Sequence, residues 1–308
     1  STPLYSSAAS DVYKRQNKSF GKRVPVLENM TFDVARSKVT GLLGPNGSGK
    51  STIMKIIAGL THADSGEVTI DLERADSYKS AVGIDHCRAS IGYLLDPEWI
   101  DTRVSILTFL RSQMLLKGIS DTKNKAIDIL DEYGLAHACN RKLAKVSLGM
   151  RQRVCLAVAF LNDPEIVILD EPHNGVDADG SIAFQNKLKE YISSGGTALI
   201  SSHLLNEVQQ FSDYVVMIKN GRTIVQKPLD QLRTTNSVLL TVRGDIESAQ
   251  RAMLNNGGHI DGVSGQTLSI SGLDTATIAE VAVRSGVKIE GLTKESKSLE
   301  SIYLELNE

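Results

Sequence analysis

The residues that carry the clearest chemistry lie in a glycine-rich loop in the first sixth of the chain. The loop fits the pattern G-x-x-x-x-G-K-[ST], and its members are Gly44, Pro45, Asn46, Gly47, Ser48, Gly49, Lys50, Ser51 and Thr52. In such a loop the glycines let backbone N–H groups curl around phosphate oxygens, and a following helix adds the positive end of its dipole. The lysine places a charge on the β- and γ-phosphates, and the next serine offers a hydroxyl to Mg²⁺. We therefore predict a nucleotide-phosphate site here rather than a glycine turn without a ligand.

A second candidate is a pair of carboxylates that follows an apolar run. Ile166–Leu169 is entirely apolar, and Asp170 and Glu171 come directly after it. A buried strand would carry both acids to the C-terminal edge of a sheet, where phosphates bind in open α/β folds. There Asp170 could hold Mg²⁺ through water, and Glu171 could orient or deprotonate an attacking water. The pair is weakly specific alone, but together with the phosphate loop it indicates nucleotide hydrolysis.

The distance between the two motifs indicates an insertion. Lys50 and Asp170 are 120 residues apart, and the pattern from Val104 to Leu161 is largely helical with short breaks. Strands alternating with helices elsewhere in this region favour a parallel α/β sheet. We therefore predict a helical subdomain, at about 97–163, inserted into the α/β domain.

A short motif inside this insertion carries a family resemblance. Residues 146–153 read V-S-L-G-M-R-Q-R, which resembles the Leu-Ser-Gly-Gly-Gln signature of the ABC ATPase family. Ser147 and Gly149 match, whereas Leu148 and Met150 replace the first glycine and the glutamine. This form is similar to that of the branch that exports drugs and antibiotics. Ser147 is also a favourable N-cap for a helix, so a capping role alone is the alternative interpretation.

The resemblance extends over residues 17–235 and implies further roles. His203, after the predicted strand Ala198–Ser201, matches the switch histidine that contacts the γ-phosphate. Asn174–Asp177 matches the loop that follows the catalytic glutamate. Phe20 matches the aromatic residue that stacks on adenine, with a core phenylalanine as the alternative.

One residue departs from the family pattern. The family usually has glutamine after the strand at Ile91–Leu95, and this chain has Asp96. An ionised aspartate only accepts hydrogen bonds, so Asp96 could bind Mg²⁺ or its water but could not donate to the γ-phosphate unless protonated. Trp99, the single tryptophan, follows in a loop that lines the permease groove in related proteins. We expect Trp99 to be partly exposed as an interface anchor, and packing between subdomains is the alternative.

The family mechanism implies partners. Two ATPase domains sandwich two ATP molecules, with Lys50 and Glu171 of one domain facing Ser147 and Gly149 of the other. One set of motifs per chain then requires a second copy or a homologous ATPase subunit. The longest apolar run, 154–161, is too short to cross a bilayer, which needs about 20 residues. A separate transmembrane permease is therefore expected, with this chain peripheral at the cytoplasmic face of the membrane.

The rest of the chain completes the predicted organisation. The expected fold is α/β, of the P-loop NTPase (ABC ATPase) type, over 17–235, followed by a small α+β domain at 236–308. Residues 1–16 show no periodicity leading into the next strand and resemble translated adaptor sequence. We expect them to be a non-native leader without a part in the fold. The apolar stripe of the final predicted helix, Leu299–Leu306, favours an internal core over a partner groove.

Composition excludes several classes of function. The net charge is −2, with 34 basic and 36 acidic residues, which lacks the basic footprint of a nucleic-acid binder. The three cysteines are widely spaced and indicate buried thiols in a reducing compartment. Neither His86–Cys87 nor the pair His137 and Cys139 forms a paired-ligand framework for a metal.

Two other functions compete with a transporter ATPase. A non-transport ABC ATPase for DNA maintenance or translation usually carries a coiled coil or two ATPase domains, and this sequence has neither heptads nor a second phosphate loop. A nucleotide sensor without catalysis is disfavoured because Lys50, Asp170, Glu171 and His203 are all present. We therefore predict an ATP- and Mg²⁺-dependent ATPase that powers a permease. The branch resemblance favours export of a drug, antibiotic, peptide or lipid-like compound.

Overall fold

The chain divides into two compact units, with the boundary between Pro228 and Leu229. The computed structural model describes residues 9–20, 24–70, 78–79, 90–120, 123–296 and 298–305. The sequence placed the boundary later, after residue 235. The difference arises because helix α7 (Leu229–Arg233) contacts α10 (Leu299–Glu305) and so belongs to the second unit.

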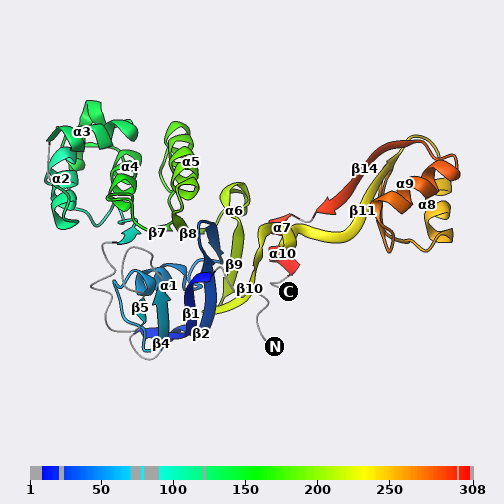
Figure 1. Cartoon of the computed structure of the whole chain (residues 1–308), viewed down its shortest axis with the longest axis horizontal. Coiled ribbons are helices and arrows are strands. Elements are labelled where there is room, and N and C mark those ends of the chain that lie inside the picture. Colours follow the sequence, from blue (N-terminus) through cyan, green and yellow to red (C-terminus); the bar gives the residue numbers. More distant parts are fainter. Residues whose placement is uncertain are drawn as a thin grey trace. The chain divides into compact units, whose positions relative to one another are not determined.

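A six-stranded sheet forms the centre of unit 1 (Figure 1). In spatial order its strands are β10 (Arg222–Pro228), β9 (Tyr214–Lys219), β3 (Val39–Leu43), β8 (Thr197–Ser202), β7 (Ile166–Asp170) and β6 (Ile91–Tyr93). All neighbours pair in parallel except β10, which returns antiparallel to β9. The turn before β10 has positive φ angles at Asn220 and Gly221, as a two-residue Asn-Gly hairpin turn requires. Strands β3, β7 and β8 are buried almost throughout, which is typical of parallel strands covered on both faces.

The two faces of this sheet pack against different partners. On one face lie α1 (Lys50–Ile57) and an antiparallel sheet of β2 (Val24–Ala35), β1 (Ala9–Phe20), β4 (Ser65–Ile70) and β5 (Tyr78–Lys79). The core on this side joins Phe32 of β2 and Ile53 of α1 to Ile168 of β7. On the other face, α4 (Leu148–Ala159) and α5 (Ala178–Ser193) pack through residues such as Cys155 and Phe184. Helix α6 (Leu205–Phe211) contacts β3 and β8.

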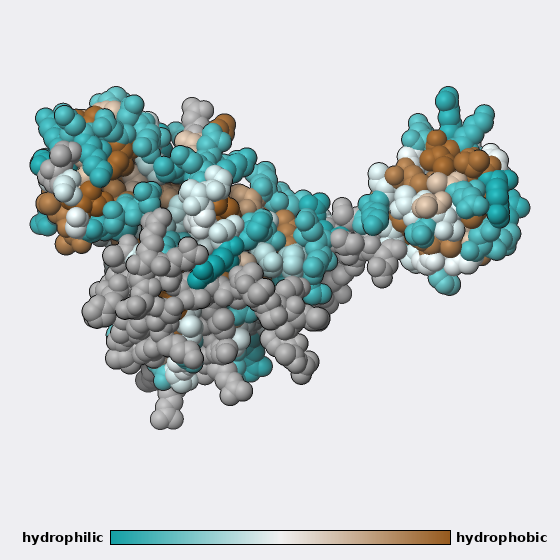
Figure 2. All heavy atoms as spheres, in the orientation of Figure 1, coloured by the Kyte–Doolittle hydropathy of each residue, from teal (hydrophilic) through white to brown (hydrophobic). Residues whose placement is uncertain are grey.

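The predicted helical insertion is present between β6 and β7. It contains α2 (Ile106–Leu116), α3 (Lys123–Glu132), α4 and the 3₁₀ turns η3 (Ala136–Ala138) and η4 (Leu143–Lys145). Ser105 caps α2 by accepting from the backbone N–H of Thr108. Figure 2 shows hydrophobic residues among hydrophilic ones on the surface of this region, and α2 exposes Leu115 and Leu116 at its end. Within the described residues, no helix combines the length and the apolar character needed to cross a membrane.

Unit 2 is an α+β unit, as predicted. Its elements follow the order β11 (Thr234–Val242), α8 (Ile246–Asn255), β12 (His259–Ser264), β13 (Thr267–Ser271), α9 (Thr275–Arg284) and β14 (Ile289–Ser296). The antiparallel sheet has the order β12-β13-β11-β14, which makes a βαββαβ motif. Leu240 and Ile270 of the sheet pack on Met253 of α8 and Ile278 of α9. In α10, Leu299 and Ile302 are buried, which supports the internal stripe for the part of this helix that is described.

Strand β1 overturns one expectation. Residues 1–16 were expected to take no part in the fold, yet Ala9–Gln16 lies in β1, between β2 and β4. Asp11, Val12 and Tyr13 each pair with both neighbouring strands. The sequence argument failed because ladder hydrogen bonds join backbone groups, so a segment with weak side-chain alternation can still fill a place between two strands. The origin of this segment stays a prediction.

Removing residues 1–16 should therefore lower the melting temperature of the full chain. The deletion separates β2 from β4 and removes several ladder hydrogen bonds, each worth about 0.5–1.5 kcal/mol net. A loss of about 2 kcal/mol corresponds to roughly 4–8 °C in a unit of this size. Removal of residues 1–8 alone is the matched control, since it leaves β1 intact. Equal melting temperatures for the two deletions would show that β1 contributes nothing to stability.

Candidate functional site

The glycine-rich loop joins the end of β3 to the start of α1 and is shaped by its glycines. Gly47 and Gly49 have φ angles of 79° and 104°, in the left-handed region that favours glycine. A Cβ on Gly49 would lie 2.6 Å from Leu27 Cδ2, and one on Gly44 would lie 2.5 Å from the Ile218 carbonyl oxygen. The loop thus requires glycine at its ends, both for its backbone conformation and for its close contact with neighbouring strands.

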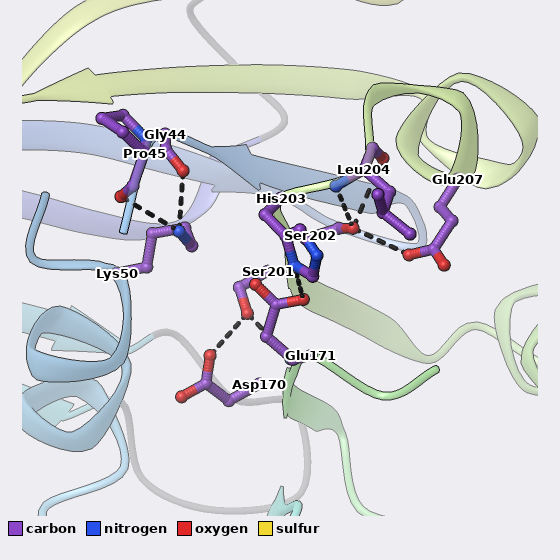
Figure 3. Close-up of polar contacts among 10 residues, drawn as sticks. All are labelled: Gly44, Pro45, Lys50, Asp170, Glu171, Ser201, Ser202, His203, Leu204 and Glu207. Carbon is purple, nitrogen blue, oxygen red and sulfur yellow. Dashed lines mark hydrogen bonds and ion pairs between the residues drawn. The ribbon is translucent and has the colours of Figure 1, made fainter. Parts of the chain in front are cut away.

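Lys50 folds back into this loop (Figure 3). Its Nζ donates to the carbonyl oxygens of Gly44 at 2.7 Å and Pro45 at 3.3 Å. Burial lowers the pKa of Lys50, while the nearby charges of Glu171 and Asp170 act in the opposite direction. The loop carbonyl oxygens therefore hold the Lys50 ammonium group inside the bend of the loop.

A buried hydroxyl in the loop supports an anionic ligand. Ser48 is 3% exposed, and its Oγ has no hydrogen-bond partner in the structure. A buried donor of this kind is costly unless something fills its hydrogen bond. Phosphate oxygens would accept from Ser48 Oγ, from Lys50 Nζ and from the backbone N–H groups at the start of α1. The loop therefore fits a polyphosphate.

The predicted carboxylate pair lies at the end of β7, beside the loop. Ser201 on the adjacent strand β8 donates from Oγ to Asp170 Oδ1 at 2.5 Å and accepts from the backbone N–H of Glu171 at 2.9 Å. Glu171 has a φ of 49°, a left-handed conformation that costs about 1–2 kcal/mol for a residue with a side chain. Such strain persists only where the surroundings enforce it and is concentrated at functional sites.

His203 follows the end of β8 and faces Glu171 (Figure 3). Its Nδ1 is 2.8 Å from Glu171 Oε2, and because an ionised carboxylate only accepts, Nδ1–H is the donor. The turn after His203 is fixed by Ser202, which donates from Oγ to Glu207 Oε2 at 2.7 Å and accepts from the Leu204 N–H at 2.9 Å. The structure thus brings Lys50, the carboxylate pair and His203 to one edge of the sheet. This set can hold phosphates, a hard cation and an attacking water.

Helix α4 begins at the signature motif. It contacts the segment that follows Glu171 in the same chain. Ser147 caps the helix by accepting from the Met150 N–H at 3.1 Å. A Cβ on Gly149 would collide with the carbonyl oxygen of Gly175. Gln152, only 2% exposed, donates from Nε2 to the Pro172 carbonyl at 3.2 Å. The capping role of Ser147 is therefore confirmed, and a nucleotide contact of Ser147 and Gly149 stays a prediction.

Asp96 and Trp99 lie in the loop after β6. Asp96 Oδ1 accepts from the Glu98 N–H at 2.8 Å. Burial raises the pKa of Tyr93, and the charges of Asp170 and Asp96 raise it further, so both acids act on the same phenol. Trp99 is 86% exposed, which confirms the predicted exposure and contradicts packing between the subdomains.

The structure leaves Phe20 untested and gives the cysteines no role in a site. The side chain of Phe20 lies outside the described residues, and so do His86 and Cys87. Cys155 is buried, and burial raises the pKa of its thiol to about 12, which makes it unreactive. Among the residues that the structure describes, no group of three or more His, Cys, Asp or Glu side chains could hold a metal ion. The carboxylate oxygens of Asp170 are of the kind that Mg²⁺ prefers.

His173 is a residue whose role the sequence left open. Its ring stacks on Phe211, with centroids 5.5 Å apart, and meets the edge of Phe184 at 5.0 Å. Nδ1 is 3.3 Å from Ser181 Oγ, and Nε2 is buried without a hydrogen-bond partner. Burial lowers the pKa of His173, against the opposing charges of Glu207 and Glu171. His173 therefore anchors the loop after Glu171 to α5 and α6 as a neutral ring.

Comparison with known proteins establishes the family. A family model described as "ABC transporter" matches residues 27–174. The lantibiotic transport ATP-binding protein SrtF of Streptococcus pyogenes is 33% identical over 216 residues, 69% of this chain and 88% of that protein. The uncharacterized ABC transporter ATP-binding protein YhcH of Bacillus subtilis is 29% identical over 284 residues, 91% of this chain and 90% of its own length.

A solved structure agrees with these sequence matches. It is described as the ATP binding subunit of an ABC transporter, with a TM-score of 0.64 and 28% identity, and the match covers 72% of this chain and 91% of that one. The chain therefore belongs to the ABC transporter family. Within that family it is an ATP-binding and ATP-hydrolysing subunit with a P-loop NTPase fold. The predicted family and enzyme class are confirmed, and a non-transport ABC ATPase is not favoured.

Replacing His173 with phenylalanine should reduce the loss of stability at acid pH. Free histidine has a pKa of about 6.5, and the pKa of His173 in the folded chain is lower. Near and below pH 6.5 the unfolded chain therefore binds more protons than the folded chain. Stability is then lost as the pH falls through about 6.5 toward the folded pKa. When the pH is lowered from 7.5 to 5.5, the melting temperature of the native chain should fall by about 2 °C more than that of His173→Phe. The phenylalanine keeps the aromatic packing. Parallel pH curves for the two proteins would contradict this assignment.

Proposed function

We propose that this chain hydrolyses ATP to drive a separate membrane permease from the cytoplasmic face of the membrane, in a transporter that exports its cargo. The observation that carries the proposal is the contact between His203 Nδ1 and Glu171 Oε2, 2.8 Å long, next to Lys50 and Asp170. This contact places a base and a polar partner together at the sheet edge where the phosphate loop begins.

Each residue of the site has a role in this proposal. The loop from Gly44 to Thr52 binds the phosphates, with Lys50 on the β- and γ-phosphates. Mg²⁺ bound with the nucleotide would neutralise charge on these phosphates. Its oxygen ligands would come from Ser51 and, directly or through water, from Asp170 and Asp96. Phe20 would stack on the adenine ring.

Glu171 and His203 act on the reacting groups. The Glu171 carboxylate accepts a proton from the attacking water, and its strained backbone aims it at the γ-phosphate position. His203 is 44% exposed at its side chain, so it can turn from Glu171 to a phosphate oxygen when nucleotide enters. The histidine would then report the presence of the γ-phosphate to the turn that Ser202 holds.

A second ATPase domain completes the site. Ser147 is exposed and its hydroxyl accepts one backbone N–H, which leaves the O–H free to donate to a phosphate of ATP bound on another subunit. Gly149 of the same turn would contribute through its backbone, since the space beside its Cα is taken by the Gly175 carbonyl oxygen of its own chain. The chain carries one phosphate loop and one signature motif, so a second copy or a homologous subunit would supply the opposite half.

The export direction and the permease rest on relatives and on one exposed side chain. One relative is the Nod factor export ATP-binding protein I of Bradyrhizobium diazoefficiens, 30% identical over 261 residues, and SrtF is named for lantibiotic transport. A drug, antibiotic, peptide or lipid-like cargo suits these names. Trp99, 86% exposed beside the helical insertion, is the anchor that we assign to the permease contact.

Glu171→Gln should abolish hydrolysis and preserve ATP binding. The amide keeps the size of the side chain and loses its basicity, so the ATPase rate should fall about 100-fold or more. The variant should accumulate an ATP-bound dimer, visible by size-exclusion chromatography with ATP. Lys50→Ala is the contrasting control and should instead weaken ATP binding by roughly 10- to 100-fold. A near-normal ATPase rate in Glu171→Gln would remove the basis of the proposed function.

Trp99→Ala should leave folding and basal ATPase nearly intact while weakening co-purification with the permease. An exposed anchor contributes little to the free subunit, but truncation of an aromatic hot spot costs about 2 kcal/mol or more in binding. The matched control is Leu60→Ala, since Leu60 is also exposed, at 57%. Trp99 emission should be quenched by iodide in the free subunit and protected in the complex. Equal permease recovery with both variants would rule out the anchor.

A further inference from the structure

We propose that Ser201 is a positioning residue for the ATPase reaction, because its single hydroxyl holds both acidic residues of the site. This inference rests on the roles proposed for Asp170 and Glu171. It adds that the geometry of the pair is set from the neighbouring strand β8, by a fully buried side chain.

The first support is the bonding of the hydroxyl. Ser201 is fully buried and lies opposite Asp170 in the parallel pairing of β7 with β8. Its Oγ–H donates to Asp170 Oδ1 at 2.5 Å, and its lone pair accepts from the Glu171 N–H at 2.9 Å. A hydroxyl can donate and accept at once, whereas an alanine at this position can do neither. Figure 3 shows the hydroxyl between the two acidic residues.

The second support is the strain at Glu171. Its φ of 49° lies in a region that residues with side chains rarely adopt, so other bonds must hold it there. The N–H of Glu171 donates to the Ser201 hydroxyl, and the carbonyl oxygen of Glu171 accepts from the Asn174 N–H at 3.1 Å. Loss of the hydroxyl leaves the N–H at the start of this strained turn without its acceptor. The backbone would then relax, and the carboxylate would leave the position that faces His203.

The third support is the position of Ser201 along its strand. Ser201 lies two residues before His203, so the strand that carries the histidine also fixes Asp170 and Glu171. A buried hydroxyl in β3 provides a contrast. Thr40 is likewise fully buried, but its Oγ1 has no hydrogen-bond partner in the structure. Loss of that hydroxyl should not disturb the acids, which makes Thr40→Val a matched control.

The test compares steady-state ATPase kinetics of the full chain and its variants at varied ATP and varied Mg²⁺. In Ser201→Ala we expect kcat to fall about 10- to 100-fold, the size expected for losing a buried hydrogen bond to a charged group. KM for ATP should change by less than about twofold, because the phosphate loop is untouched. The Mg²⁺ concentration for half-maximal rate should rise severalfold, because Asp170 is no longer oriented. Thr40→Val should keep kcat within about twofold of the native chain.

Conservative variants separate positioning from packing. Ser201→Thr keeps the hydroxyl and should recover most of kcat, and Ser201→Cys, with a weaker donor of similar size, should be intermediate. Any of three results would overturn the proposal. These are a native kcat in Ser201→Ala, a kcat in Ser201→Cys that is no higher than in Ser201→Ala, and a loss of kcat in Thr40→Val equal to that in Ser201→Ala. Glu171→Gln is measured in parallel. If Glu171→Gln hydrolyses ATP, the proposed function itself fails. If Glu171→Gln is inactive while Ser201→Ala is fully active, only the positioning role of Ser201 is rejected.

Discussion

The parallel pairing of β3, β8 and β7 is the constraint on which the site depends. In this register Leu43 lies opposite Ser202, and Ser201 lies opposite Asp170, so the three strands end at nearly the same level. The phosphate loop, His203 and Glu171 each begin one or two residues beyond. Because parallel strands carry their carboxyl ends to one edge, residues far apart in the sequence meet there without any long loop. A one-residue slip of β8 would turn Ser201 away from the acids and break the site.

Charge balance at this edge offsets part of the cost of burying the charged side chains of the site. Lys50 is buried and its pKa is lowered, yet Asp170 and Glu171 offset part of the desolvation cost. The carboxylates in turn accept from Ser201 and His203. Each of these charges therefore has a polar partner within the chain. The buried Ser48 hydroxyl has no such partner and adds a donor that suits an anionic ligand.

The sequence predicted what depends on local spacing and missed what depends on contacts across strands. The phosphate loop and the acids at the end of β7 each lie within a few residues, so the residue types alone indicate the geometry. Ser201 and Gln152 act on residues 31 and 20 positions away, and only the fold brings them together. The signal for Ser201 was a polar residue at the end of a buried strand, which indicates burial but not the partner, whereas Gln152 lies between Arg151 and Arg153 and gave no such signal. Strand β1 was missed because pairing through the backbone leaves little trace in side-chain order.

Helix α4 combines an exposed N-terminus with a buried contact. Ser147 at its N-cap is exposed, and one turn later Gln152 donates to the Pro172 carbonyl oxygen of the same chain. Pro172 directly follows the strained Glu171, so a rotation of α4 would displace the backbone beside this carboxylate. Helix α4 also belongs to the helical insertion, whose entry loop bears the exposed Trp99, so one helix connects this insertion to the loop after Glu171. A helix transmits such a displacement with little loss, because its hydrogen bonds resist bending and its buried side chains are closely packed.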